Sequence, residues 1–171
     1  NEAQRNEESK SDFTTSQLYD FTHQDEWIFE NLSSKNQVRG PIKSYRKELF
    51  QKMNGLRAVL GWDNIDVMLC KMHGFETVTL QELWVKHLRP TAYKYKSQKA
   101  QKLGEYFYNI GLNFPLAAIS SAKSSLKNKS ISEFFITMKS FLKQKNPRVL
   151  SQEEIAFIRN LRWKEIKRKL M

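Results

Sequence analysis

Side chains that could perform covalent or metal chemistry are few and scattered in this 171-residue chain. There is one cysteine, Cys70, and three histidines, and the sequence has no glycine-rich phosphate loop, no His-Glu-x-x-His and no Gly-x-Ser-x-Gly. A Cys/His zinc site needs clustered ligands, and a disulfide needs a second cysteine. The neighbouring acids Glu153 and Glu154 fall in the first turn of an expected helix, where they favour the positive end of its dipole. We therefore predict no catalytic residues, no cofactor and no metal site.

Basic side chains outnumber acidic ones in this chain, 29 against 18. Residues 1–34 contain eight acids and two bases, whereas residues 35–171 contain 27 bases and ten acids. An acidic leader thus precedes a body with a net charge of +17. These lysines could simply keep a helical surface soluble, but so large an excess favours a polyanionic partner, of which nucleic acid is the commonest.

Hydrophobic periodicity predicts helices along most of the chain. Apolar residues recur at helical spacing, and strict strand-like alternation is nearly absent. We therefore expect an all-α fold, a helical bundle of about seven or eight helices that contains a helix-turn-helix. The expected helical segments are one or two within 13–32, then 45–60, 63–72, 79–89, 97–110, 116–121, 131–145 and 151–171.

Several residues mark where these helices begin and end. Gly74 is expected to take a left-handed backbone conformation that stops the helix over 63–72. Thr79-Leu-Gln-Glu82 and Ser151-Gln-Glu-Glu154 match the capping box, in which two side chains satisfy backbone N–H groups at a helix start. Cys70 lies on the apolar face of its helix and is expected to be a small buried hydrophobe.

A helix-turn-helix is the arrangement that would use the basic residues best. Thr79–Arg89 and Ser97–Ile110 would be its two helices, with the second in the major groove. Gln98 can read adenine through two hydrogen bonds, and lysines neutralise phosphates. The alternative is an ordinary helical hairpin with a solvated basic face. The predicted DNA-binding residues are Lys35, Arg39, Lys43, Lys86, Arg89, Lys94, Lys96, Ser97, Gln98, Lys99 and Lys102.

The same stretch resembles a known family. HGFETVTLQELW, residues 73–84, resembles the central signature of the AT-rich interaction domain (ARID), in which a glycine, an aromatic residue, an acid and a valine precede a tryptophan. KAQKLGEYFYNI, residues 99–110, is similar to the helix that follows it, and the resemblance covers about residues 25–115. It implies an all-helical DNA-binding domain of chromatin and transcription regulators. DNA contact would come through residues 35–43 and 86–102.

A second resemblance falls on overlapping residues. WDNIDVML and QELWVKHLRP look like the last two helices of a Myb/SANT repeat. In that family the recognition helix would be Thr79–Arg89 instead of Ser97–Ile110. Both resemblances imply that the chain binds double-stranded DNA.

Together these observations predict three segments: an acidic leader (1–24), a helix-turn-helix DNA-binding domain (25–115) and a C-terminal helical extension (116–171). The expected function is a non-enzymatic, nuclear, double-stranded DNA-binding module, with phosphate contacts dominant and a modest A·T preference. The alternative is a helical protein–protein module, with residues 151–171 docking subunits of a chromatin complex, and RNA binding is a third possibility. No apolar run approaches the ~20 residues that span a membrane, so no membrane partner is expected.

Overall fold

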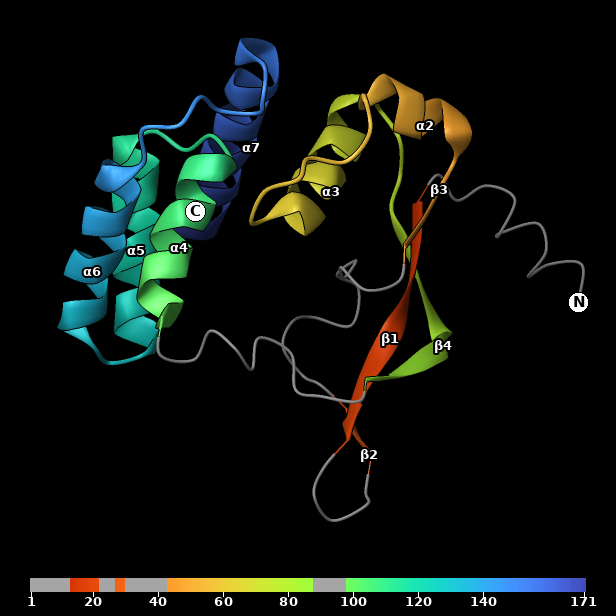
Figure 1. The fold of residues 1–171 in the computed structure, drawn as a ribbon, viewed down its shortest axis with the longest axis horizontal. Coiled ribbons are helices and arrows are strands. Elements are labelled where there is room, and N and C mark those ends of the chain that lie inside the picture. The colour runs from red at the N-terminus through yellow and green to blue at the C-terminus, as the bar shows by residue number, and fades with distance from the viewer. Residues whose placement is uncertain (1–12, 22–26, 30–42, 88–97) are drawn as a thin grey trace, which may run out of the picture. The chain divides into compact units, whose positions relative to one another are not determined.

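The computed structural model describes residues 13–21, 27–29, 43–87 and 98–171, which form two compact units (Figure 1). Unit 1 comprises residues 1–56 and 66–93, and unit 2 comprises residues 57–65 and 94–171. This division differs from the predicted one at residue 115, because the segment after residue 94 groups with the C-terminal helices. The predicted leader lies mostly outside the described residues.

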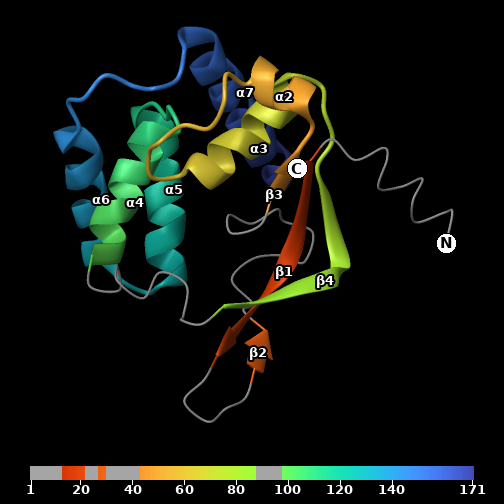
Figure 2. The same cartoon turned by 45° about the vertical axis from the view of Figure 1, so that its right-hand side comes forward.

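Unit 1 is built around a small four-stranded sheet, shown in Figure 2. Its central strand, β1 (Phe13–Phe21), pairs antiparallel with β2 (Trp27–Phe29) and β3 (Lys43–Tyr45). It pairs in parallel with β4 (Val78–His87). The β1–β4 register shifts once, as at a β-bulge, so the two strands are not in continuous register along their length.

This sheet corrects two predictions, since segments 13–32 and 79–89 were expected to be helices. Both segments have apolar residues at helical spacing. Segment 13–32 is also rich in threonine and aromatic residues, and β4 contains two valines, a threonine and a tryptophan; these residue types favour strands. Pairing with each other satisfies their backbone groups and overrides the local pattern. The predicted capping box at Thr79 is therefore not formed, because Thr79 lies in β4.

Two further helices contain residues of unit 1. α2 (Lys47–Lys52) is much shorter than the predicted helix over 45–60, because Gly55 follows it with a φ of +72°. α3 (Trp62–Met72) matches its prediction and crosses the division between the units. Gly74, with a φ of +76°, is the left-handed residue expected after α3, and Cys70 is buried as expected.

Unit 2 contains four helices, and the sequence predicted most of them. They are α4 (Lys99–Asn109), α5 (Phe114–Lys127), α6 (Ile131–Lys143) and α7 (Gln152–Leu170). The capping box at Ser151 is confirmed: the Glu154 N–H donates to the Ser151 hydroxyl at 3.1 Å, and the Ser151 N–H donates to the Glu154 carboxylate at 2.7 Å. α5 is longer than the expected helix over 116–121, because the helix continues through the serine-rich residues that follow.

Helix dominates the described chain, as predicted, although the sheet of unit 1 was not foreseen. Six helices lie within the described residues, against the predicted seven or eight. The helix-turn-helix is not formed as predicted, because the segment expected to be its first helix forms the strand β4. None of the described helices is both long enough and apolar enough to cross a membrane.

Candidate nucleic-acid interface

The positive charge of the chain is concentrated in unit 2. Unit 2 holds 18 lysines and arginines against six acids, a net charge of +12. Unit 1 holds 11 bases against 12 acids, a net charge of −1. A surface that attracts polyanions therefore belongs to the helical unit and not to the sheet.

A polar groove of about 690 Å³ runs between α4 and α6, and it is called the α4–α6 groove below. Its lining is rich in cations and side-chain amides, and Glu105 is its one acid. The cations come from α4, from α6 and from the residues that follow α6: Lys102, Lys139, Lys143 and Lys145. The amides are those of Gln98, Gln101, Gln144 and Asn146.

Close packing of two helix backbones places these side chains. At Gly104, an added Cβ would lie 2.3 Å from the carbonyl oxygen of Thr137, so only glycine allows this approach. The Thr137 hydroxyl donates to the Ala100 carbonyl at 3.1 Å, and the Ser140 hydroxyl donates to the Gln101 carbonyl at 2.7 Å. These contacts fix α4 against α6 and hold the two walls of the groove together.

The lysines on the α6 side of the groove are open to solvent. Lys139 and Lys143 are four residues apart and so share one face of α6. With Lys145 they are exposed, and none of the three forms an ion pair with another described residue. Lys102 differs, because its ammonium lies 2.9 Å from the Glu105 carboxylate. The groove therefore offers mobile point charges for phosphates and amide donors for phosphate oxygens or base edges.

The predicted DNA-binding residues are only partly brought together. Gln98 and Lys102 line the groove, and Lys99 is exposed in the first turn of α4. Lys86 lies in β4 and not in a helix. The others, apart from Lys43, lie outside the described residues: Lys35, Arg39, Arg89, Lys94, Lys96 and Ser97.

Lys43 requires a correction. Its ammonium donates to both Asp66 carboxylate oxygens, at 3.0 and 2.8 Å, and each side chain is only 2% exposed. The Tyr45 hydroxyl donates to the same carboxylate at 2.6 Å. A lysine that is neutralised and buried in this way cannot reach a phosphate, so its role in this arrangement is structural.

Sequence reasoning missed Lys139, Lys143 and Lys145. Their signal was present, because two lysines at i, i+4 spacing in an amphipathic helix must share a face. No feature of the sequence near these lysines predicts that this face of α6 lies beside α4. Within the described residues, no three His, Cys, Asp or Glu side chains are grouped so that they could hold a metal ion.

Comparison with known proteins gives no match: no family model, no curated protein and no solved structure matches the chain. The ARID and Myb/SANT resemblances therefore remain predictions. Both place a helix over residues 79–89, but residues 79–87 of that segment lie in β4, so neither supplies the geometry for contact with DNA. The case for a nucleic-acid interface rests on the charges of unit 2.

Proposed function

We propose that the chain is a non-enzymatic, double-stranded DNA-binding module of a nuclear chromatin or transcription regulator, and that unit 2 carries its binding surface. The observation that carries this proposal is the net charge of +12 on unit 2, with three solvent-exposed lysines along one groove. Duplex DNA is the polyanion that such a surface fits best, since phosphate neutralisation supplies most of the affinity of sequence-tolerant binders.

Binding would work chiefly through counterion release. Each lysine that neutralises a phosphate frees condensed counterions, and the logarithm of the affinity falls by about 0.9 per decade of salt for each phosphate contacted. The glutamine and asparagine amides of the groove can donate to phosphate oxygens and fix the register. The four amides are the side chains of the groove best suited to reading bases, and no arginine lines it, so sequence preference is expected to be modest.

Fluorescence anisotropy with labelled A·T-rich and G·C-rich duplexes, titrated across salt concentration, tests the proposal. The informative variant is Lys139→Glu with Lys143→Glu. Its matched control is Lys47→Glu with Lys71→Glu, because both of these lysines are exposed in unit 1 and the change in total charge is the same. We expect the groove variant to lose at least about tenfold in affinity and about two units of salt slope. The control should stay within about threefold of the parent chain.

Equal losses in the two variants would show that total charge, and not the groove, governs binding. Absence of binding at low salt would refute the DNA proposal. It would favour the second candidate, docking of an acidic protein partner by residues 151–171. That candidate is supported by the four exposed bases near the end of α7, Lys164, Lys167, Arg168 and Lys169.

A further inference from the structure

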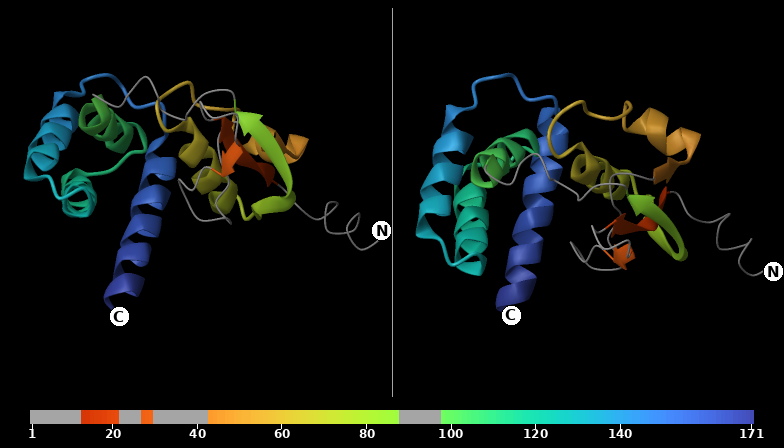
Figure 3. Two further views of the ribbon diagram at one scale, coloured as in Figure 1. Left: turned by 90° about the horizontal axis from the view of Figure 1, so that it is seen from below. Right: turned by 60° about the horizontal axis from the view of Figure 1, so that its bottom comes forward.

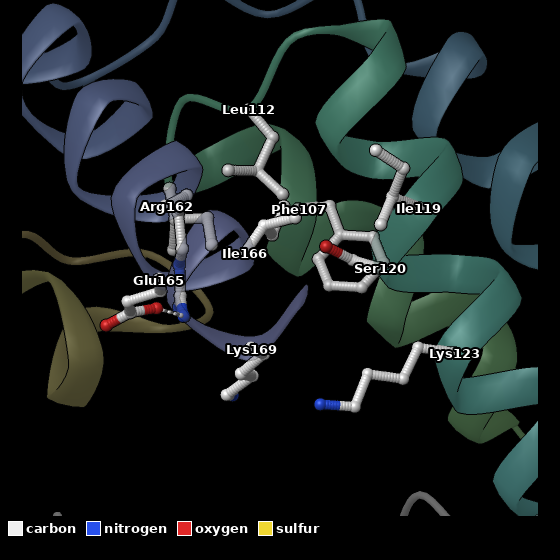
Figure 4. Close-up of a pocket in the computed structure, with 10 residues that line it drawn as sticks. Phe107, Leu112, Ile119, Ser120, Lys123, Arg162, Glu165, Ile166 and Lys169 are labelled. Atoms are coloured by element: carbon white, nitrogen blue, oxygen red, sulfur yellow. Dashed lines mark hydrogen bonds and ion pairs between the residues drawn. The ribbon is translucent and has the colours of Figure 1, made fainter. Parts of the chain in front are cut away.

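A second cavity of unit 2 lies among α4, α5 and α7 and has a volume of about 440 Å³ (Figure 4). Its walls are mainly apolar and come from all three helices, chiefly through Phe107, Ile119 and Ile166. Its cations are Lys123, Arg162 and Lys169, against the single acid Glu165. The cavity shares no lining residue with the α4–α6 groove.

The cavity exists because α7 packs closely over only part of its length. Ile155 and Ile158, in its first half, are buried in the core of unit 2. Beyond Ile158, no described residue of α7 is buried. Figure 3 shows the C-terminal half of α7 running clear of the other helices of this unit. Apolar side chains are left open, among them Ile119, which is 42% exposed, and an apolar occupant would remove them from water.

The cations of the cavity are not equivalent. Arg162 lies 3.1 Å from the Glu165 carboxylate, so its charge is largely compensated. Lys123 and Lys169 form no ion pair with any described residue. In Figure 4 their side chains lie along the same edge of the cavity, away from Leu112. One end is therefore apolar and the opposite edge carries two uncompensated positive charges.

We propose that this cavity binds an amphiphilic carboxylate, with an aliphatic tail against Phe107, Ile119 and Ile166 and its head group between Lys123 and Lys169. Charge complementarity selects an anionic head, and the apolar walls select a hydrocarbon tail. The volume falls within the roughly 300–1,000 Å³ typical of small-molecule sites. This inference does not rest on DNA binding, because it uses none of the groove lysines.

Decanoate, used below its critical micelle concentration, is a suitable probe. Titration of the full chain, followed by NMR of isoleucine methyl groups, should shift the signals of Ile119 and Ile166 first. Nonyltrimethylammonium has a tail of the same length and the opposite charge, and it should bind at least about tenfold more weakly. This pair of ligands separates recognition of the head group from simple hydrophobic adsorption.

The matched variants are Lys123→Glu with Lys169→Glu, and, as control, Lys127→Glu with Lys129→Glu. All four lysines are exposed, so neither variant removes a core contact. The first variant should lower the affinity for decanoate at least about tenfold, whereas the control should change this affinity by less than about threefold. Ile119→Trp, which fills the mouth of the cavity, should abolish the methyl shifts at Ile166.

Three results would overturn the proposal: equal affinity for the two amphiphiles, insensitivity to Lys123→Glu with Lys169→Glu, or shifts confined to apolar residues outside the cavity. Binding of an acidic peptide without binding of decanoate would also overturn it and assign the cavity to a protein partner. Loss of DNA affinity in the groove variant with decanoate binding intact would show that the two sites are separate. Decanoate binding without any DNA binding would leave this proposal standing alone.

Discussion

Replacing Gly104 by alanine tests the packing that forms the α4–α6 groove. An alanine Cβ would lie 2.3 Å from the Thr137 carbonyl oxygen, 2.7 Å from the Phe141 nitrogen and 2.7 Å from the Ser140 Cβ. Two of these three atoms belong to the backbone, so no side-chain rotation relieves the clash. The helices would have to separate by about 1 Å to restore ordinary van der Waals contact.

Two opposing effects set the size of the change in stability. Alanine favours the helix over glycine by about 1 kcal/mol. Against this, separating the helices strains or breaks the hydrogen bonds from Thr137 and Ser140, each worth about 1 kcal/mol. Overpacking a tight contact adds about 1–3 kcal/mol. We therefore expect a net loss of about 2–4 kcal/mol in the free energy of unfolding.

Urea unfolding followed by far-ultraviolet circular dichroism measures this difference. Gln101→Ala is the control, because Gln101 is exposed in the same helix and should change the free energy of unfolding by less than about 0.5 kcal/mol. A Gly104→Ala protein as stable as the parent, or more stable, would mean that helix propensity dominates. The close approach of α4 to α6 would then not restrict position 104 to glycine.

Three further substitutions probe the buried polar contacts. Lys43→Met should lower the free energy of unfolding by about 3–5 kcal/mol, because it leaves the Asp66 carboxylate buried without its cation. DNA affinity should be unchanged under conditions in which the variant stays folded. Thermal unfolding measures the first effect and fluorescence anisotropy the second. Glu154→Gln should cost about 1–3 kcal/mol in urea unfolding, because it weakens both the α7 capping box and the 2.7 Å pair with Arg57. Burial raises the pKa of Tyr106, so the folded state keeps a proton that the unfolded chain releases above about pH 10. Stability should therefore fall as the pH rises through that range, and Tyr106→Phe should reduce the fall, as seen in urea midpoints at pH 9 and 11.

The helices of unit 2 could be predicted because their signals are local. The Ser151–Glu154 capping box and the amphipathic pattern of residues 131–145 both act within a few residues. The β1–β4 pair could not be predicted in this way, since it joins Thr14 to Val78 across most of unit 1. Residues 79–89 have an apolar spacing that also suits a helix, and a distant partner strand decides between the two structures.

The candidate interface shows the same limit at the level of single side chains. A lysine can bind a phosphate only if it is not already buried in an ion pair with a carboxylate. The sequence does not show ion pairs between residues that are far apart along the chain. Lys43 meets Asp66 across 23 positions, whereas Lys139 and Lys143 remain solvent-exposed. Net charge alone therefore leads to the prediction of a polyanionic partner, and the structure distinguishes the exposed lysines from the buried Lys43.

Unit 2 includes a short segment that is distant in sequence from the rest of that unit. Residues 57–65 belong to unit 2 although they interrupt unit 1 in sequence. Arg57 pairs with Glu154, and the Leu60 carbonyl accepts a hydrogen bond from Asn109 at 3.2 Å. Gly61 lies so close to the Tyr106 ring that an added Cβ would be 2.5 Å from it. A fragment that begins at residue 94 would lack all three contacts, so the fold of the basic unit depends on residues 57–65 as well as on the residues after 94.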